Sequence, residues 1–275
     1  MARSETRSTS QKAMRAALIL YAAGSIAAGI LDLIWRDFEP AHQPIQALGD
    51  HIPGRAVLAL LAAVWLIAGG SAILAPRLAR SGALSLAAIY LTFAAFWLPR
   101  FYTAVHALGL HFAVVTGLFA GIGQQLILVA AAVIVYRSPP GSGWPAQPGV
   151  PGLIRWAFGL SSVAFGLAHL TGVGQVAAMV PPWMPLGGNV WAILTGMAFV
   201  FAGLAMLSRI LDVLAARLLA LMLFLFSVLV LSRAPLARPH NHVAWGSNAY
   251  NLAAVGAVWL FAEALAMRQT PPGRN

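Results

Sequence analysis

Long apolar runs recur along this chain from residue 16 to residue 266, and they limit its fold more than any other feature. A helix needs about 20 mostly apolar residues to cross a hydrocarbon core about 30 Å thick. Eight runs are long enough: 16–35, 56–75, 82–99, 117–136, 153–170, 189–208, 214–231 and 248–266. Because lipid cannot satisfy backbone amides, runs of this length are expected to be helices and not barrel strands. The sequence therefore predicts an all-α transmembrane protein, an eight-helix bundle.

Basic residues are distributed unequally between the connections of these helices. Twelve Lys and Arg residues precede the first helix or follow every second one, and five lie in the alternate connections. By the positive-inside rule, both termini are expected in the cytoplasm. The net charge of +10 is thus a topology signal, and we expect no nucleic acid partner. The basic residues are Arg with a single Lys, which favours a high-GC bacterium and hence a bacterial inner (cytoplasmic) membrane.

An internal repeat divides the chain into two four-helix units. The first and fifth runs share a pattern at a constant offset of 137 residues: Ser25-x3-Gly29-x2-Asp32 and Ser162-x3-Gly166-x2-His169. The fourth and eighth runs align without gaps, from His111 to Arg137 and from His242 to Arg268. We expect tandem parallel repeats over 1–138 and 153–275, joined by a cytoplasmic Pro/Gly linker at 139–152. A secretory signal peptide is the competing interpretation of the N-terminus, but the repeat requires the first helix.

Histidines gather on one predicted side of the membrane. All seven lie on or beside the outer side, where imidazoles can ligate haem, copper or zinc, or hydrogen-bond a quinone carbonyl. The candidate cofactor-binding residues are Asp32, His111, His169, His242, Asn248 and Asn251, and the candidate metal ligands are His111, His240 and His242. The alternative is that the histidines belong to an interfacial aromatic belt, since none of their spacings matches a defined metal motif.

Asp32 is the strongest individual candidate. Ionisable groups at membrane depth usually face the bundle interior or a polar cavity. Two partners are open for its carboxylate: His169 from the other unit, or Arg36 at i+4 on the same helix. Asn248 and Asn251 are spaced i to i+3 and share a helix face. They are expected either to line a polar pocket or to form interhelical hydrogen bonds.

The second unit resembles the DoxX family of small four-helix membrane proteins. The matching pieces are the Gly and His near the end of the fifth run, the turn "MVPPWMP", and the Trp and Thr-Gly of the sixth run. The likeness is strongest in residues 155–208, and the first unit looks like a diverged copy. The resemblance implies an integral-membrane subunit near quinone chemistry; the matching positions are His169, Pro181, Trp183 and Pro185. The fusion of two units departs from the family pattern and would replace a homodimer of single units.

No catalytic motif accompanies this resemblance. The sequence has no phosphate-binding loop, nucleophile elbow, H-E-x-x-H or dinucleotide fingerprint, and it has no Cys. We therefore expect at most a membrane subunit of an oxidoreductase, working with a partner redox protein and with quinone or a His-ligated metal as its cofactor. The alternatives are a small-molecule or ion transporter and a non-catalytic membrane interaction protein. The lack of clearly broken helices argues against the transporter.

Overall fold

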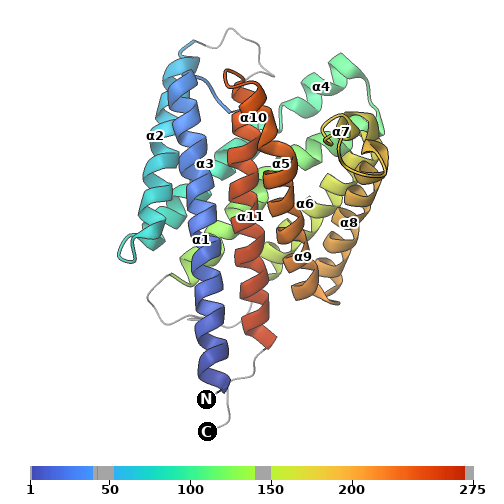
Figure 1. The fold of residues 1–275 in the computed structure, drawn as a ribbon. Coiled ribbons are helices and arrows are strands. Elements are labelled where there is room, and N and C mark those ends of the chain that lie inside the picture. Colours follow the sequence, from blue (N-terminus) through green and yellow to red (C-terminus); the bar gives the residue numbers. More distant parts are fainter. Residues whose placement is uncertain (1, 40–41, 43–52, 140–149, 270–275) are drawn as a thin grey trace.

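The protein is an all-helical bundle in the computed structural model, which describes residues 2–39, 42, 53–139 and 150–269 (Figure 1). In chain order the elements are α1 (Ala2–Trp35), α2 (Arg55–Leu74), α3 (Ala79–Phe96), α4 (Arg100–Leu108), α5 (Phe112–Arg137), α6 (Gly152–Thr171), α7 (Val173–Ala177), α8 (Gly188–Ser208), α9 (Asp212–Leu225), the π-helical segment η3 (Phe226–Leu231), α10 (Arg233–Ala237) and α11 (His242–Gln269). The described chain contains no strand. This confirms the predicted all-α class.

Eight helical stretches of the described chain are long and apolar enough to cross a membrane. They are Thr9–Trp35, Arg55–Leu74, Ala79–Leu108, Phe112–Arg137, Gly152–Thr171, Gly188–Ser208, Asp212–Ala237 and His242–Met267. Each overlaps one of the runs expected from the sequence. The protein is therefore a multi-pass α-helical membrane protein.

Three short helices and the π-helical segment were not expected from the sequence. The third stretch contains α4 in addition to α3, and the seventh contains α9, η3 and α10. Helix α7 lies between the fifth and sixth of the predicted spans, in a connection for which no helix was predicted. Helix α11 begins at His242, six residues before the predicted start at 248, so the polar residues that precede the apolar run are helical.

Lipid-facing and buried faces are both apolar, as a membrane environment requires. Exposed apolar side chains such as Leu61, Val64 and Leu91 cover the outside of α2 and α3. In a protein surrounded by water, apolar patches of this extent would be unusual. The interior combines many alanines with large side chains, and Tyr21 and Phe261 are among those fully buried.

Glycines bring the helix backbones close together. A Cβ on Gly24 of α1 would collide with the backbone of Ala253 in α11. A Cβ on Gly29 would lie 2.7 Å from the Ala63 carbonyl oxygen in α2. Because lipid supplies no hydrophobic drive between helices, this close approach is a main source of attraction between them.

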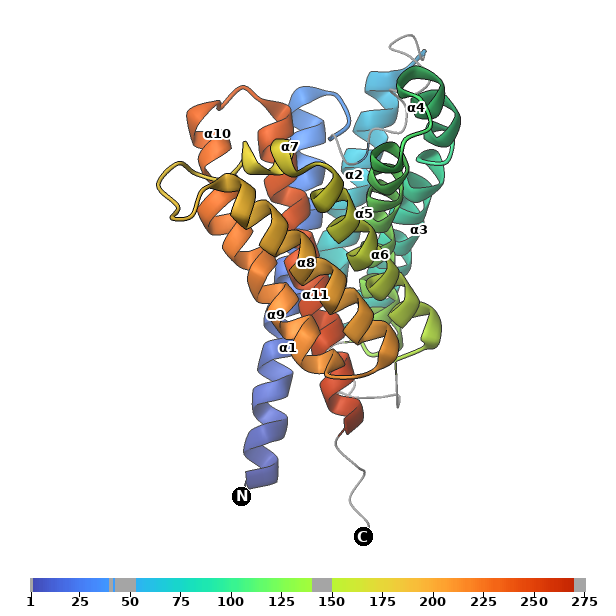
Figure 2. The ribbon, with the colours of Figure 1, turned by 90° about the vertical axis from the view of Figure 1, so that its right-hand side faces the viewer.

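The two ends of the bundle differ in their elements. The start of α1 and the end of α11 lie at one end, here called the proximal end (Figure 1). The short helices α4, α7 and α10 lie at the other, here called the distal end (Figure 2). The predicted linker at 139–152 falls mostly on residues 140–149, which are outside the described residues.

Candidate functional site

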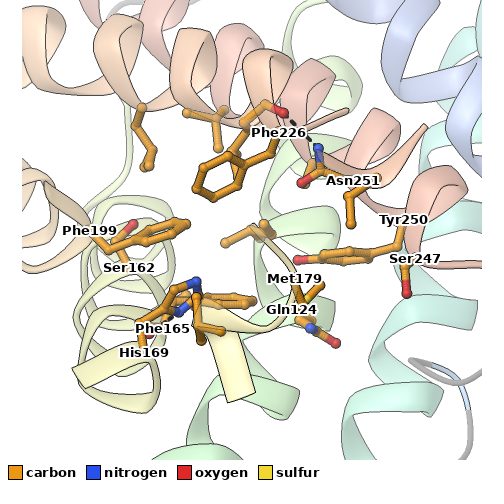
Figure 3. Close-up of a pocket in the computed structure, with 18 of the residues that line it drawn as sticks. Gln124, Ser162, Phe165, His169, Met179, Phe199, Phe226, Ser247, Tyr250 and Asn251 are labelled. Atoms are coloured by element: carbon orange, nitrogen blue, oxygen red, sulfur yellow. Dashed lines mark hydrogen bonds between the residues drawn. The ribbon is translucent and has the colours of Figure 1, made fainter. Parts of the chain in front are cut away.

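A cavity of about 420 Å³ lies among α5, α6, α7, α8, α9, η3 and α11 (Figure 3). It extends from Val176 and Met179, at the distal end, to Leu219 and Val258 deeper in the bundle. Aromatic rings form much of its wall: Trp97, Phe165, Phe199, Phe226 and Tyr250. Polar side chains interrupt this wall at a few points: Glu39, Gln124, Ser161, Ser162, His169, Ser247 and Asn251. An apolar chamber with a few polar groups is the usual form of a small-molecule site.

His169 reaches this cavity from the last turn of α6. Its Nδ1 lies 2.9 Å from the carbonyl oxygen of Phe165, one turn earlier. A carbonyl oxygen only accepts, so Nδ1 carries the hydrogen, and Nε2 of the neutral ring is left as an acceptor. The ring also lies against Phe199, with 5.1 Å between centroids. This fixes the orientation of the imidazole, and Nε2 is the atom available to a ligand hydroxyl.

Asn251 also lines the cavity, and it is tied to the π-helical segment. Its Nδ2 donates to the carbonyl oxygen of Leu223 at 2.7 Å and to Ser227 Oγ at 2.6 Å. Asn248, one turn earlier in α11, donates to the carbonyl oxygen of Leu231 at 2.6 Å. Both amides thus satisfy carbonyls in or beside η3. Asn251 takes both roles weighed for it, since it faces the cavity and forms interhelical hydrogen bonds.

The π-helical segment itself was missed by the sequence prediction. A π-helix bonds residue i to i+5 and has no regular compositional signature, yet such segments occur often at functional sites. Phe226 and Leu231, its first and last residues, both line the cavity. The one signal that pointed to it was the pair of asparagines on a single face of α11. The seventh helix is therefore interrupted beside the cavity.

Asp32 lies near the distal end of α1 and is completely buried. Its Oδ1 accepts the backbone N–H of Glu39 at 2.6 Å. Two imidazoles face it: His42 Nδ1 lies 3.8 Å from Oδ2, and His242 Nε2 lies 3.9 Å from Oδ1. In the described chain these histidines are the ionic partners of Asp32. Arg36, exposed and in the left-handed region with φ of 50°, is not its partner, and neither is His169.

Asp32, Glu39, His42 and His242 together form what is called the distal cluster below. His42 lies 3.8 Å from Glu39 Oε2 as well, and it stacks on Phe93 with 4.1 Å between centroids. His242 stacks on Trp35 at 4.8 Å with the ring planes 2° apart. Asp32 and His242 were candidate site residues from the sequence, whereas Glu39 and His42 were not. These two follow the first helix in the chain and carry no periodic pattern.

The charge on His42 is favoured by its surroundings. Burial alone lowers the pKa of this imidazole. The interaction with the Asp32 carboxylate and the negative charges of Glu39 and Asp32 act in the opposite direction, and the net result is a raised pKa. An imidazolium at this position partly balances two buried carboxylates, which would otherwise be costly to keep ionised.

Glu39 connects the distal cluster to the cavity. It contacts His42 within the cluster and is also one of the residues that line the cavity. Gly246 of α11 makes room for it, because a Cβ on Gly246 would lie 2.9 Å from Glu39 Cδ. The cavity and the cluster are therefore neighbouring parts of one site that share a carboxylate.

The predicted metal ligands are not gathered in one place. His111 is the exposed N-cap residue of α5, with its ring over Gly109, and His240 is exposed in the turn before α11. Only His242 belongs to the distal cluster. Among the described residues, no group of three or more His, Cys, Asp or Glu is arranged to hold a metal ion. The structure therefore gives no support to a metal site at His111, His240 and His242.

The fold and site define an integral membrane protein with eight candidate spans and a ligand-sized cavity inside the helical bundle. Comparison with protein-family models, with curated proteins and with solved structures finds no match to this chain. The resemblance to the DoxX family thus rests on the sequence pieces alone.

Proposed function

We propose that this protein binds a small amphipathic ring molecule of the quinone class in the cavity. It would act as a DoxX-like subunit or scaffold of a quinone-linked redox complex in a bacterial inner membrane, beside a partner redox protein. The observation that carries the proposal is the wall of the cavity, which combines aromatic rings with a few separated polar groups.

The wall matches the chemistry of a quinone head group. Phe165, Phe199 and Phe226 offer faces and edges against which a flat ring can stack. His169 Nε2, as an acceptor, is suited to a ring hydroxyl. The side chains of Gln124 and Tyr250 add donors for a ring oxygen. The volume of about 420 Å³ lies within the range of small-molecule sites, roughly 300–1,000 Å³.

The two-unit architecture is part of the same proposal, and the packing of the helices supports it. Helix α1 packs on α2 as α6 packs on α8, and α3 packs on α5 as α9 packs on α11. The contacts between the proposed units also correspond, with α1 on α11 and α6 on α5. A two-fold axis along the membrane normal would relate the units. With both termini cytoplasmic, the distal end and its histidines would face outward.

Quinone binding can be tested with the purified full-length chain in mild detergent. Quinone that co-purifies is measured by mass spectrometry, and affinity is measured with a short-chain quinol. We expect about one site per chain. His169→Ala should weaken binding roughly fivefold, because one hydrogen bond contributes about 1 kcal/mol. The matched control is His111→Ala, which removes an exposed imidazole outside the cavity. Equal affinities for wild type and both variants would contradict the proposal.

A transporter is the second candidate, and η3 is the observation that favours it. Transport sites often lie beside interrupted helices, and this segment interrupts the seventh span next to the cavity. Proteoliposomes containing this chain alone should then move a small amphipathic solute faster than protein-free vesicles. A rate equal to that of vesicles without protein would rule out transport of that solute by the chain alone.

A further inference from the structure

Quinone binding assigns no role to most of the distal cluster. Three of its atoms are buried and have no hydrogen-bond partner in the described part of the chain: Asp32 Oδ2, His42 Nδ1 and His242 Nε2. Asp32 is completely buried and His42 is 2% exposed. Buried polar atoms are nearly always satisfied, so unsatisfied ones gathered around one carboxylate indicate an occupant or an exchangeable proton.

The spacing of these atoms fits a bridging water. The separations of 3.8 Å and 3.9 Å between the imidazoles and Asp32 are too long for a direct hydrogen bond. A single water about 2.8 Å from each atom spans such a gap. Stacking of His42 on Phe93 and of His242 on Trp35 holds the imidazoles at this distance. The gaps are therefore built into the packing.

Titratable groups come to the cluster from several elements. Asp32 comes from α1; Asp37, Glu39 and His42 follow it; Tyr90 comes from α3; His242 and Tyr250 come from α11. The Asp37 carboxylate is bound by Arg55 at 2.8 Å. In the described chain neither Arg nor Lys pairs with Asp32, whose ionic partners are both imidazoles. Histidine is the side chain that changes its charge near neutral pH.

We propose that the distal cluster is a proton-transfer site for the ligand in the cavity. Glu39 exchanges a proton with a ligand hydroxyl, and His42, positioned by Asp32 and His242, receives it from Glu39 through a bridging water. This inference rests on the proposed function, because the ligand must carry an exchangeable O–H.

The transfer involves a proton alone. The ligand O–H bond breaks, the ligand keeps the electron pair, and an O–H bond forms on the Glu39 carboxylate. That bond then breaks as an N–H bond forms at the unprotonated Nδ1 of a neutral His42 ring, 3.8 Å from Glu39 Oε2, with the water carrying the proton between them. Asp32 does not touch the ligand; it is a positioning residue that stabilises the imidazolium.

The first test measures proton binding without any ligand. The full-length protein, with ¹⁵N-labelled histidines, is placed in lipid nanodiscs and its imidazole signals are followed from pH 5 to pH 9, a range of about two units on either side of neutrality. His42, assigned by the signal lost in His42→Gln, should titrate above the ordinary value of 6.5. Asp32→Asn should lower that midpoint. The control Asp37→Asn removes a neighbouring carboxylate that Arg55 binds, and it should leave the midpoint near the wild-type value.

A His42 midpoint that is the same in wild type and in Asp32→Asn would overturn the cluster as a proton site. Asp32→Asn keeps the size of the side chain. Its folding is checked by gel filtration and thermal denaturation. A variant that fails to fold is replaced by Asp32→Glu, which keeps the charge and must restore a raised midpoint if the proposal is correct.

The second test measures the coupling between cluster and cavity. Calorimetric binding of a short-chain quinol in buffers of different ionisation enthalpy gives the protons exchanged per ligand bound. We expect a fractional proton exchange that varies with pH in wild type and disappears in Glu39→Gln, while Asp37→Asn behaves as wild type. Binding with no proton exchange at any pH would overturn the transfer role and leave the proposed function standing. Absence of binding would overturn both, while the His42 titration would still decide whether the cluster binds a proton.

Discussion

Two buried aspartates lie near opposite ends of the bundle, and their partners differ in kind. At the proximal end, Asp212 Oδ2 accepts from Arg155 Nη1 at 2.7 Å, and its Oδ1 accepts the backbone N–H of Val213 at 2.8 Å. Arg155 Nη1 also donates to the carbonyl oxygen of Met206 at 2.8 Å. At the distal end, Asp32 faces imidazoles across gaps of 3.8 Å and 3.9 Å.

The two carboxylates therefore differ in whether their partners can lose their charge near neutral pH. Arg stays charged at every pH a protein experiences, so the pair of Arg155 with Asp212 is permanent. It holds together α6, the end of α8 and the start of α9, across a turn in which Arg209 and Leu211 have positive φ. An imidazole can lose its charge near neutrality, so the surroundings of Asp32 change with protonation. The four predictions below test this contrast, beginning with the largest expected effect.

The largest effect is expected at the proximal pair. Arg155→Met leaves the Asp212 carboxylate buried without its cation, which costs about 3–5 kcal/mol of unfolding free energy. The measurement is unfolding by SDS in mixed micelles. Arg80→Met, at an exposed position of α3, is the matched control and should change stability by less than about 0.5 kcal/mol. A loss in Arg155→Met as small as that of the control would show that the pair is not structural.

Asp32→Asn should be far milder, with a change of about 1 kcal/mol or less in unfolding free energy at neutral pH. The amide oxygen can still accept the Glu39 N–H, and the cost of burying a charge is removed. The same SDS unfolding series provides the comparison with Arg155→Met. If Asp32→Asn lost as much stability as Arg155→Met, Asp32 would be as structural as Asp212, and the contrast between the two ends would fail.

The sequence predicted the eight spans and singled out Asp32 because both depend on local information. A run of about 20 apolar residues is enough to identify a span, and a carboxylate within such a run is costly wherever the chain folds. Local information could not identify Glu39 and His42, because they lie after the end of α1 and outside any apolar run. Their role depends on contacts with α3 and α11, which no periodic pattern in the sequence encodes.

The repeat alignment made His111 and His242 equivalent, and the structure separates them. His111 and His242 occupy corresponding positions before α5 and α11, yet His111 is exposed beside Gly109 while His242 lies between Trp35 and Asp32. Positions that align in the sequence need not have the same neighbours, because each lies against different side chains. The sequence indicated at which end of the bundle the histidines lie. Which of these histidines come together depends on neighbouring side chains from other helices.

A third prediction concerns pH. The pKa of His42 is raised in the folded protein above its ordinary value of 6.5. Its contribution to stability is therefore fully present below pH 6.5 and is lost as the pH rises through the raised value. SDS unfolding of wild type should show this loss, and the difference between wild type and His42→Gln should shrink with rising pH. The effect should be smaller than that of Asp32→Asn, because it changes one partner's protonation and leaves the carboxylate in place.

Exposed His106 is the control, since His106→Gln should leave the pH profile unchanged. A difference that grows with pH would contradict the assigned direction of the shift.

The smallest effect is expected for side chains that donate a hydrogen bond to a backbone carbonyl oxygen. Both ends of the bundle contain such a bond. At the proximal end, Arg155 holds the carbonyl of Met206; at the distal end, Asn248 holds that of Leu231 at 2.6 Å. Interhelical hydrogen bonds of this kind contribute about 0.6 kcal/mol in a membrane protein, so Asn248→Leu and Asn251→Leu should each lose roughly that amount of unfolding free energy.

The ligand affinities of the two variants should differ, because Asn251 lines the cavity and Asn248 is not among its lining residues. In a quinol titration Asn251→Leu should bind more weakly, while Asn248→Leu should match wild type. If the two variants bound equally weakly, the shape of η3 as a whole, and not the Asn251 amide, would control the site.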